Sequence, residues 1–247
     1  MKITNKQSHL EYVCEKIESV NIITAPWNHL HIKNIFPDDL YKKIRNEITE
    51  YIPDARDNKR VSKRIYNTTR DYNVATGLID KTPEKSPYES WLLYHTKYKT
   101  YPHGLEEYYN ILDSIEIKNI LTKKFNITRK YKNGLKHVFS DCDIMTPGYE
   151  WPIHTDIPRK LVTFIHYFAE ENDDEEIGTR LYPTTSIKSL DYENDCVKII
   201  PFVENSALIF SPCDIDGKCT NHAMRNKSTI TKYRKAIQTF FIKQPKE

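Results

Sequence analysis

Polar and apolar residues alternate along the second half of the chain, from about residue 136 to residue 242. Successive side chains of a β-strand point to opposite faces, so this alternation predicts strands with one face toward a core. The predicted strands cover His137 to Ser140, Leu161 to Phe168, Arg180 to Tyr182, Val197 to Phe202, Ala207 to Phe210 and Arg234 to Ile242. Many short strands without intervening helices predict an antiparallel sandwich or barrel.

The first 135 residues carry mainly helical patterns. Apolar residues at helical spacing predict a helix over residues 8 to 19, and acidic residues followed by basic ones predict a second helix from Leu40 to Ile52. Between them, Ala25 to Phe36 alternates like a half-buried strand. Glu106 to Phe125 has the pattern of two short helices.

Length and composition fit one domain. With 247 residues the chain can bury a large core, and we predict a single domain (1–247) made of an N-terminal extension (1–135) and a β core (136–247). A net charge of +3 with mixed signs gives no sign of a polyanionic partner. No segment approaches the ~18 apolar residues that span a bilayer. Five cysteines without a CxxC pair favour a reducing, cytoplasmic location.

Three stretches leave alternatives open. Arg56 to Arg70 is basic, which is typical of a solvated loop or strand edge and less often of a phosphate-binding patch. Trp91 to Tyr109 is rich in tyrosine and could stack nucleic-acid bases, although aromatic residues covering a core are the commoner case. The acidic run Glu170 to Glu176 is simplest as the solvated tip of a hairpin.

A separate motif carries the candidate chemistry. His154 and Asp156 lie two positions apart in a segment that we expect to be extended, so both side chains can reach one ion. His222 lies downstream of a turn-rich loop and can supply a third ligand, with Arg234 beyond it as an anchor for an acidic co-substrate. Two histidines and one carboxylate on one face form a ligand set of non-haem Fe(II), with positions left open for a co-substrate and dioxygen.

Other histidines fit structural positions better. His29 and His31 share one strand face and could clamp a metal ion, but no third ligand candidate lies nearby in the sequence. Alternation places Thr163 and Tyr167 on one side of their strand and His166 on the other. We therefore interpret His166 as a packed sheet residue.

The surroundings of His154 and Asp156 resemble a known family. Successive segments are similar, in order and spacing, to the Fe(II)/2-oxoglutarate-dependent oxygenases, especially the prolyl-4-hydroxylase-like branch. These segments are residues 146–156, 160–168, 178–183 and 205–210, then His222 and residues 233–237. The resemblance covers roughly residues 136 to 242, and implies a mainly β fold with α-helices (α+β): a double-stranded β-helix, or jelly roll, flanked by N-terminal helices.

The resemblance also implies roles for individual residues. His154, Asp156 and His222 would bind Fe(II), and Arg234 would pair with the distal carboxylate of the co-substrate 2-oxoglutarate. Further co-substrate contacts would come from Tyr167, with Thr163 on its strand face, and Phe240 would form a wall of the pocket.

Two positions depart from the family. A tyrosine expected about ten residues before the first iron histidine is replaced by Ile144 and Met145, and Tyr149 is our candidate to substitute for it. The family's Gly-Gly pair is reduced to Gly178-Thr179. The extended arginine-rich signature of nucleic-acid demethylases is absent, which disfavours a nucleic-acid substrate.

The implied reaction is hydroxylation of a C–H bond with dioxygen, coupled to conversion of 2-oxoglutarate to succinate and CO₂. A carboxylate at Asp156 favours hydroxylation, because related halogenases have a small residue there. The substrate would be a protein side chain or a small molecule, bound partly by residues 53–135. The alternative function is a non-catalytic β-sandwich that binds nucleic acid or glycan through the basic and tyrosine-rich stretches.

Overall fold

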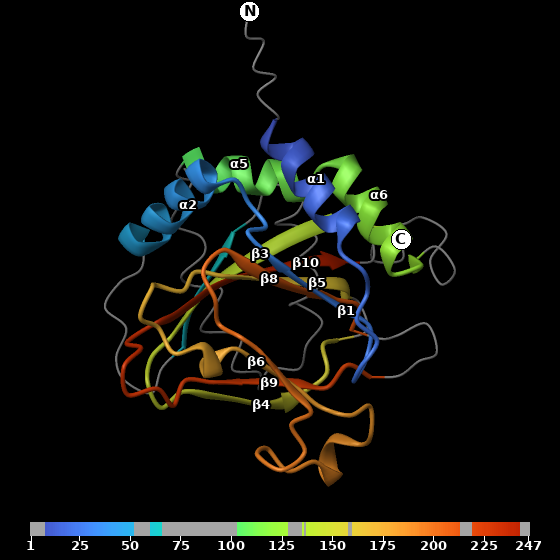
Figure 1. The fold of residues 1–247 in the computed structure, drawn as a ribbon, viewed down its shortest axis with the longest axis vertical. Coiled ribbons are helices and arrows are strands. Elements are labelled where there is room, and N and C mark those ends of the chain that lie inside the picture. Colours follow the sequence, from blue (N-terminus) through green and yellow to red (C-terminus); the bar gives the residue numbers. More distant parts are fainter. Residues whose placement is uncertain are drawn as a thin grey trace, which may run out of the picture.

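Two antiparallel sheets face each other, and helices cover the outer face of the larger sheet in the computed structural model (Figure 1). The structure describes residues 8–51, 60–65, 103–127, 135, 137–157, 160–212 and 219–242. The larger sheet has the order β1-β8-β5-β10-β3-β2 and the smaller one β4-β9-β6-β7.

The strands of the larger sheet are β1 (His29–Lys33), β2 (Arg60–Ile65), β3 (His137–Met145), β5 (Lys160–Tyr167), β8 (Ser206–Phe210) and β10 (Arg234–Ile242). Those of the smaller sheet are β4 (Glu150–His154), β6 (Thr179–Leu181), β7 (Lys198–Ile200) and β9 (His222–Arg225). From β3 to β10 the chain passes repeatedly between the two sheets, so that residues from both sheets meet in the space between them.

The helical layer consists of α1 (His9–Ser19), α2 (Asp38–Tyr51), α5 (His103–Leu112) and α6 (Ile115–Lys124). Helix α1 begins at a capping box, in which Ser8 accepts from the Glu11 amide and Glu11 accepts from the Ser8 amide. The buried faces of α1, α5 and α6 join one apolar cluster with Val162, Phe164 and other outward-facing residues of the larger sheet.

A second apolar cluster fills the space between the sheets. It includes Ile165 and Tyr167 of β5, Leu208 of β8 and Leu181 of β6. The predicted alternation along β5 is therefore confirmed from Val162 to Phe168, because neighbouring residues join different clusters. Leu161 is the exception: it joins the cluster under the helices, next to a register shift between β5 and β10.

Most predicted elements are confirmed, and their boundaries shift by a few residues. Helices α1, α2, α5 and α6 correspond to the four predicted ones, and β10 has the predicted bounds. Regular pairing in the segment Ala25 to Phe36 is limited to β1, together with an isolated bridge between Ile23 and His29. The basic stretch contains an edge strand, β2.

One expectation about a connecting segment was wrong, and one strand was missed. The acidic run Glu170 to Glu176 is not a hairpin tip, because β5 before it and β6 after it belong to different sheets. Strand β9 was not predicted at all, and it carries the third candidate metal ligand, His222.

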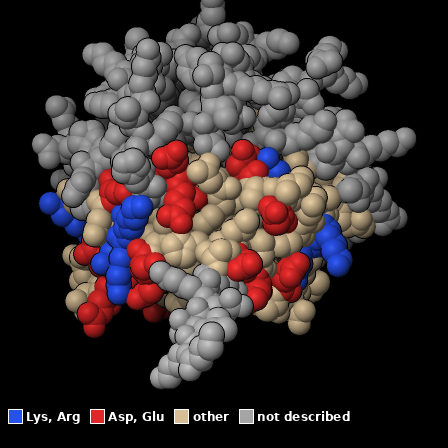
Figure 2. All heavy atoms as spheres, turned by 90° about the horizontal axis from the view of Figure 1, so that it is seen from above, with Lys and Arg blue, Asp and Glu red and all other residues tan. Residues whose placement is uncertain are grey.

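Three further features concern helix length, surface charge and the tyrosine-rich stretch. Within the described residues, no helix is long and apolar enough to cross a membrane. Acidic side chains dominate the charged part of the described surface that is seen from above (Figure 2). Tyr108 and Tyr109, at the end of the tyrosine-rich stretch, are buried in the core and cannot stack on bases. Residues 66–102, which include residues 91–102 of that stretch, lie outside the described residues.

Candidate metal centre

A tight turn leads into the strand that carries the first candidate ligand. Gly148 has a φ of 80°, a left-handed conformation that glycine adopts without a steric penalty, and its amide donates to Asn226 O at 2.6 Å. The chain then enters β4, which pairs with β9 so that His154 lies opposite His222. Asp156 lies just beyond the end of β4, whereas we expected it within a strand.

The structure brings the three predicted ligands together. Ligand atoms of His154, Asp156 and His222 lie within 4.8 Å of one another, and no other such group of three is found among the described residues. The two imidazole rings are 4.2 Å apart between centroids. His29, His31 and His166 are outside this group.

Backbone carbonyls select the tautomer of both histidines. His154 Nδ1 lies 2.9 Å from Pro152 O, and His222 Nδ1 lies 2.9 Å from Thr220 O. Because a carbonyl oxygen can only accept, each Nδ1 carries the proton and each Nε2 keeps its lone pair. In this arrangement Trp151 Nε1 donates to His154 Nε2 at 3.1 Å.

Charge at the centre also suits a divalent cation. Burial lowers the pKa of His154 to about 3, and burial likewise lowers the pKa of His222 although Asp156 opposes that shift. Burial would raise the pKa of Asp156, but the Lys160 ammonium and the two imidazoles hold it well below its usual range. At neutral pH the centre thus offers two neutral imidazoles and one carboxylate, the forms that bind metals.

Two side chains of β5 hold the carboxylate. Thr163 Oγ1 donates to Asp156 Oδ2 at 2.6 Å, and Lys160 Nζ bonds Asp156 Oδ1. The Lys160 ammonium also lies over the ring of Phe240, 3.6 Å from its centroid. Phe240 is opposite Thr163 in the sheet register, so both residues point toward the centre.

A second polar site lies between the sheets, around Arg234. This arginine is fully buried; its Nε donates to Ile177 O at 2.7 Å and its Nη2 to Thr179 Oγ1 at 3.4 Å. Thr179 Oγ1 is 2.6 Å from the hydroxyl of Tyr167. Burial raises the pKa of Tyr167, which therefore stays protonated at neutral pH. A guanidinium and two hydroxyls thus converge in an apolar setting, as a buried carboxylate requires.

Gly178 allows β6 to reach this position. A Cβ atom at Gly178 would lie 1.8 Å from Ile200 O of the paired strand, so a larger residue would push β6 and β7 apart. Gly178 therefore has a packing role at this position. Its neighbour Thr179 adds a hydroxyl to the Arg234 site.

No protein-family model matches the chain, and no curated protein matches it in sequence. Solved structures do match. A prolyl-4-hydroxylase from Pseudomonas putida superposes with a TM-score of 0.53 at 11% identity, over 96% of this chain and 100% of that one. A structure of prolyl 4-hydroxylases from Phytophthora capsici gives 0.54 at 11% identity, over 97% and 67%. A 2OG-Fe(II) oxygenase family oxidoreductase from Burkholderia pseudomallei gives 0.50 at 10% identity, over 96% and 91%.

The chain shares its fold with these oxygenases. The resemblance predicted from the sequence is thereby confirmed at the level of the fold. At identities near 10% a shared fold does not establish a shared reaction. The reaction that the protein can catalyse depends on the residues of the two polar sites.

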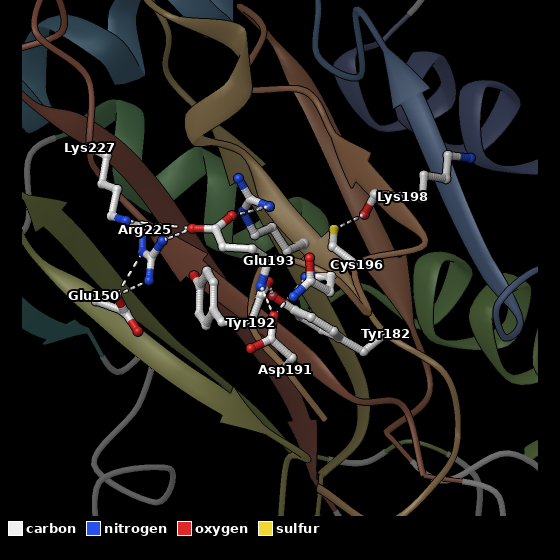
Figure 3. A network of polar contacts seen from close by, with 11 residues as sticks. Glu150, Tyr182, Asp191, Tyr192, Glu193, Cys196, Lys198, Arg225 and Lys227 are labelled. Carbon is white, nitrogen blue, oxygen red and sulfur yellow. Dashed lines mark hydrogen bonds and ion pairs between the residues drawn. The ribbon is translucent and has the colours of Figure 1, made fainter. Parts of the chain in front are cut away.

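The loop of residues 183–197 is held against the outer face of the smaller sheet by ion pairs and ring contacts (Figure 3). Arg225 of β9 pairs with Glu150 of β4 and with Glu193 of the loop, and its guanidinium lies 3.9 Å from the ring centroid of Tyr192. Arg180 reaches the same Glu193 at 3.5 Å. The strand that carries His222 therefore also anchors this loop.

Several residues of the two sites were not foreseen. Lys160 and Thr179 entered only as members of family motifs, and Asn221, which accepts a hydrogen bond from Thr155, was not singled out. Their contacts depend on which strands pair and face each other, so the spacing of residues gives no signal for them.

Tyr149, the candidate substitute for the family tyrosine, is half-buried, with its ring 6.4 Å from that of Trp151. Met145 Sδ lies 3.7 Å from Arg234 Nη1.

Proposed function

We propose that the protein is an Fe(II)- and 2-oxoglutarate-dependent dioxygenase that hydroxylates a C–H bond. The observation that carries the proposal is the convergence of His154, Asp156 and His222 within 4.8 Å on a fold shared with such oxygenases. The balanced reaction consumes the substrate C–H compound, dioxygen and 2-oxoglutarate, and yields the alcohol, succinate and CO₂. We infer a single domain over residues 1–247, with its core from residue 136 onward.

We propose that strands β3 to β10 form a double-stranded β-helix. It is supported by the passage of these strands between sheets, with β3, β5, β8 and β10 in one and β4, β6, β7 and β9 in the other. In this architecture the candidate ligands of β4 and β9 face the inner side of β5 and β10. The site thus lies between the two sheets, where Asp156 and His222 are buried and His154 is half-buried.

The donor set fits Fe(II). When bound, Fe(II) supplies the open coordination positions at which dioxygen is activated and a 2-oxo acid is chelated. The Nδ1 atoms of His154 and His222 bond carbonyls, so their Nε2 lone pairs are the ones that would bind the metal; at His154 the metal would replace the bond that Trp151 donates to Nε2. Asp156 is ionised, and Thr163 fixes the direction of its carboxylate.

Arg234 is proposed to bind the distal carboxylate of 2-oxoglutarate. Its planar guanidinium can bond both oxygens, and the hydroxyl of Tyr167 can donate a further hydrogen bond. The support is the buried position of Arg234 on the inner face of β10, together with its shared contact with Tyr167 through Thr179. Phe240 would wall the space between the two sites, and Tyr149 is proposed as an additional co-substrate contact.

The substrate is proposed to be a protein side chain or a small molecule. Prolyl hydroxylases among the similar structures favour a protein side chain. Helices α5 and α6, from the predicted extension, pack on the outer face of the larger sheet, opposite the metal ligands. A substrate mouth built from residues 53–135 would therefore use other parts of that segment.

A spectroscopic experiment tests the proposal. Anaerobic addition of Fe(II) and 2-oxoglutarate to the full chain should produce the visible charge-transfer absorption of the chelate. His222→Ala should abolish the band, whereas His29→Ala should keep it. His29 is a matched control because it is equally buried and its Nδ1 bonds a carbonyl two residues earlier, at 2.8 Å. A folded wild-type protein without the band would refute the proposal.

A further inference from the structure

Asn221, the residue before the third candidate ligand, joins three segments of the chain. Its side chain is fully buried. Its Oδ1 accepts from Thr155 Oγ1 at 2.7 Å, and its Nδ2 donates to Pro183 O at 2.7 Å and to Thr185 O at 2.8 Å. Asn221 O also accepts from the amide of Tyr182 at 3.0 Å.

The partner Thr155 lies between two candidate ligands, His154 and Asp156. One hydrogen bond therefore links the segment His154–Asp156 directly to Asn221, the residue beside His222. A side-chain amide suits this position because it combines one acceptor with two donor hydrogens, and all three are used here. An aspartate could still accept from Thr155 but could not donate to either carbonyl.

Backbone pairing alone does not hold the three ligands. The pairing of β4 with β9 places His154 opposite His222, but the register shifts between Trp151 and His154, and Asp156 lies beyond the end of β4. The bond from Thr155 to Asn221 continues the connection past the point where the strand ends. It thereby adds a contact between the segment that carries Asp156 and the residue beside His222.

We propose that Asn221 is a positioning residue of the metal centre, which holds the His154–Asp156 segment in place against His222 and fastens both to the loop of residues 183–197. The inference rests on the proposed metal-binding function. At its start the loop is bonded to Asn221, the residue before β9. Near its end, Glu193 of the loop pairs with Arg225 of β9 (Figure 3). The metal ligands and this loop therefore form one connected unit.

Loss of such a supporting contact typically weakens metal binding by about 10- to 100-fold. We therefore expect Asn221→Asp and Thr155→Val to lower the affinity for Co(II), a spectroscopic substitute for Fe(II), by about this factor. The absorption spectrum of bound Co(II) should change as well, because the spectrum reports ligand geometry. A residue with only a structural role would lower thermal stability without altering this spectrum.

The experiment is an anaerobic Co(II) titration of the metal-free full chain, with a chelator in competition. Asn226→Asp is the matched control, because Asn226 is an equally buried asparagine whose Nδ2 donates to Met145 O at 3.0 Å. It lies past the other end of β9, so we expect its affinity and Co(II) spectrum to equal those of the wild type. Thr155 is only half-buried, so Thr155→Val decides the question if Asn221→Asp does not fold.

The outcomes separate the two proposals. If the wild type binds Co(II) and both variants bind it with the same affinity and spectrum, the role of Asn221 is refuted and the proposed function stands. If the wild type binds no Co(II), both proposals fall. Weaker binding and an altered spectrum in Thr155→Val, with a normal Asn226→Asp protein, support the inference.

Discussion

Thr163 Oγ1 donates a 2.6 Å hydrogen bond to Asp156 Oδ2, across the gap between β5 and the end of β4. Both side chains are buried, so the hydroxyl has little competition from water. The carboxylate is therefore held in one orientation by a residue of the opposite sheet. In this site the sheet that carries β5 helps to define the geometry of ligands from the other sheet.

Thr163→Val should lower the affinity of the centre for Fe(II) or Co(II) by about ten-fold, because the isosteric valine cannot orient the carboxylate. Thr163→Ser should restore most of the affinity. Thr239→Val is a control of similar cost to folding, since Thr239 is equally buried on the helical side of the same sheet and lies 2.7 Å from Ser140 Oγ. Equal metal affinities in Thr163→Val and Thr239→Val would contradict the prediction.

Thr179 is expected to support co-substrate binding without affecting the metal. Its hydroxyl lies 2.6 Å from the Tyr167 hydroxyl and accepts from Arg234 Nη2, so Thr179→Val removes an oxygen that contacts both residues. A hydrogen bond within such a charged site contributes ~1.5–3 kcal/mol, so affinity for 2-oxoglutarate should fall roughly 10- to 100-fold. An anaerobic titration followed by the charge-transfer band measures it, with Co(II) affinity unchanged. Thr179→Ser should behave like the wild type; a valine variant with normal affinity would exclude the role.

The contacts of Arg225 should protect the loop of residues 183–197 from proteolysis. Arg225→Met removes two ion pairs and the contact with Tyr192, so trypsin should cut after the exposed Lys188 several-fold faster. Arg45→Met is the matched control: it removes an ion pair with Glu204 and a contact with the ring of Tyr41 elsewhere. Mass spectrometry of the fragments identifies the site. Equal cleavage rates at Lys188 in Arg225→Met and Arg45→Met would show that the contacts of Arg225 do not restrain the loop.

The three candidate ligands could be predicted because each depends on short-range information. His154 and Asp156 are close in sequence, and His222 is marked by its place after a turn-rich loop. The faces of β5 followed in the same way from alternation, which separates Thr163 and Tyr167 from His166.

Features that depend on strand order could not be predicted in this way. The acidic run after β5 was taken for a hairpin because its flanking strands are neighbours in sequence, yet they lie in different sheets. Strand β9, His222–Arg225, is buried at three of its four positions, so its residues do not alternate between apolar and polar. The contacts of Asn221 and Thr179 join segments far apart in the chain, and no local pattern encodes such meetings.

His166 should make the protein sensitive to acid. Burial lowers the pKa of this imidazole to about 3, and its ring lies among Phe36, Tyr108 and Phe168. An imidazole in the unfolded chain titrates near ~6.5, so the unfolded state binds the proton first as the pH falls. The stabilising contribution of His166 is therefore complete above pH ~6.5 and is lost by about 1.4 kcal/mol per pH unit down to its folded-state pKa.

His166→Phe removes this titration while keeping an aromatic ring among its neighbours. Between pH 6.5 and 5, the free energy of unfolding of the variant should fall less steeply than that of the wild type, by about 1.4 kcal/mol per pH unit. Urea denaturation at several pH values measures both curves, and equal urea dependences of the two proteins ensure that the same transition is compared. Asn205 keeps its bonds to Phe36 N and O in the variant, so the backbone beside His166 stays anchored. Parallel curves for the two proteins would mean that His166 is protonated equally in the folded and unfolded states.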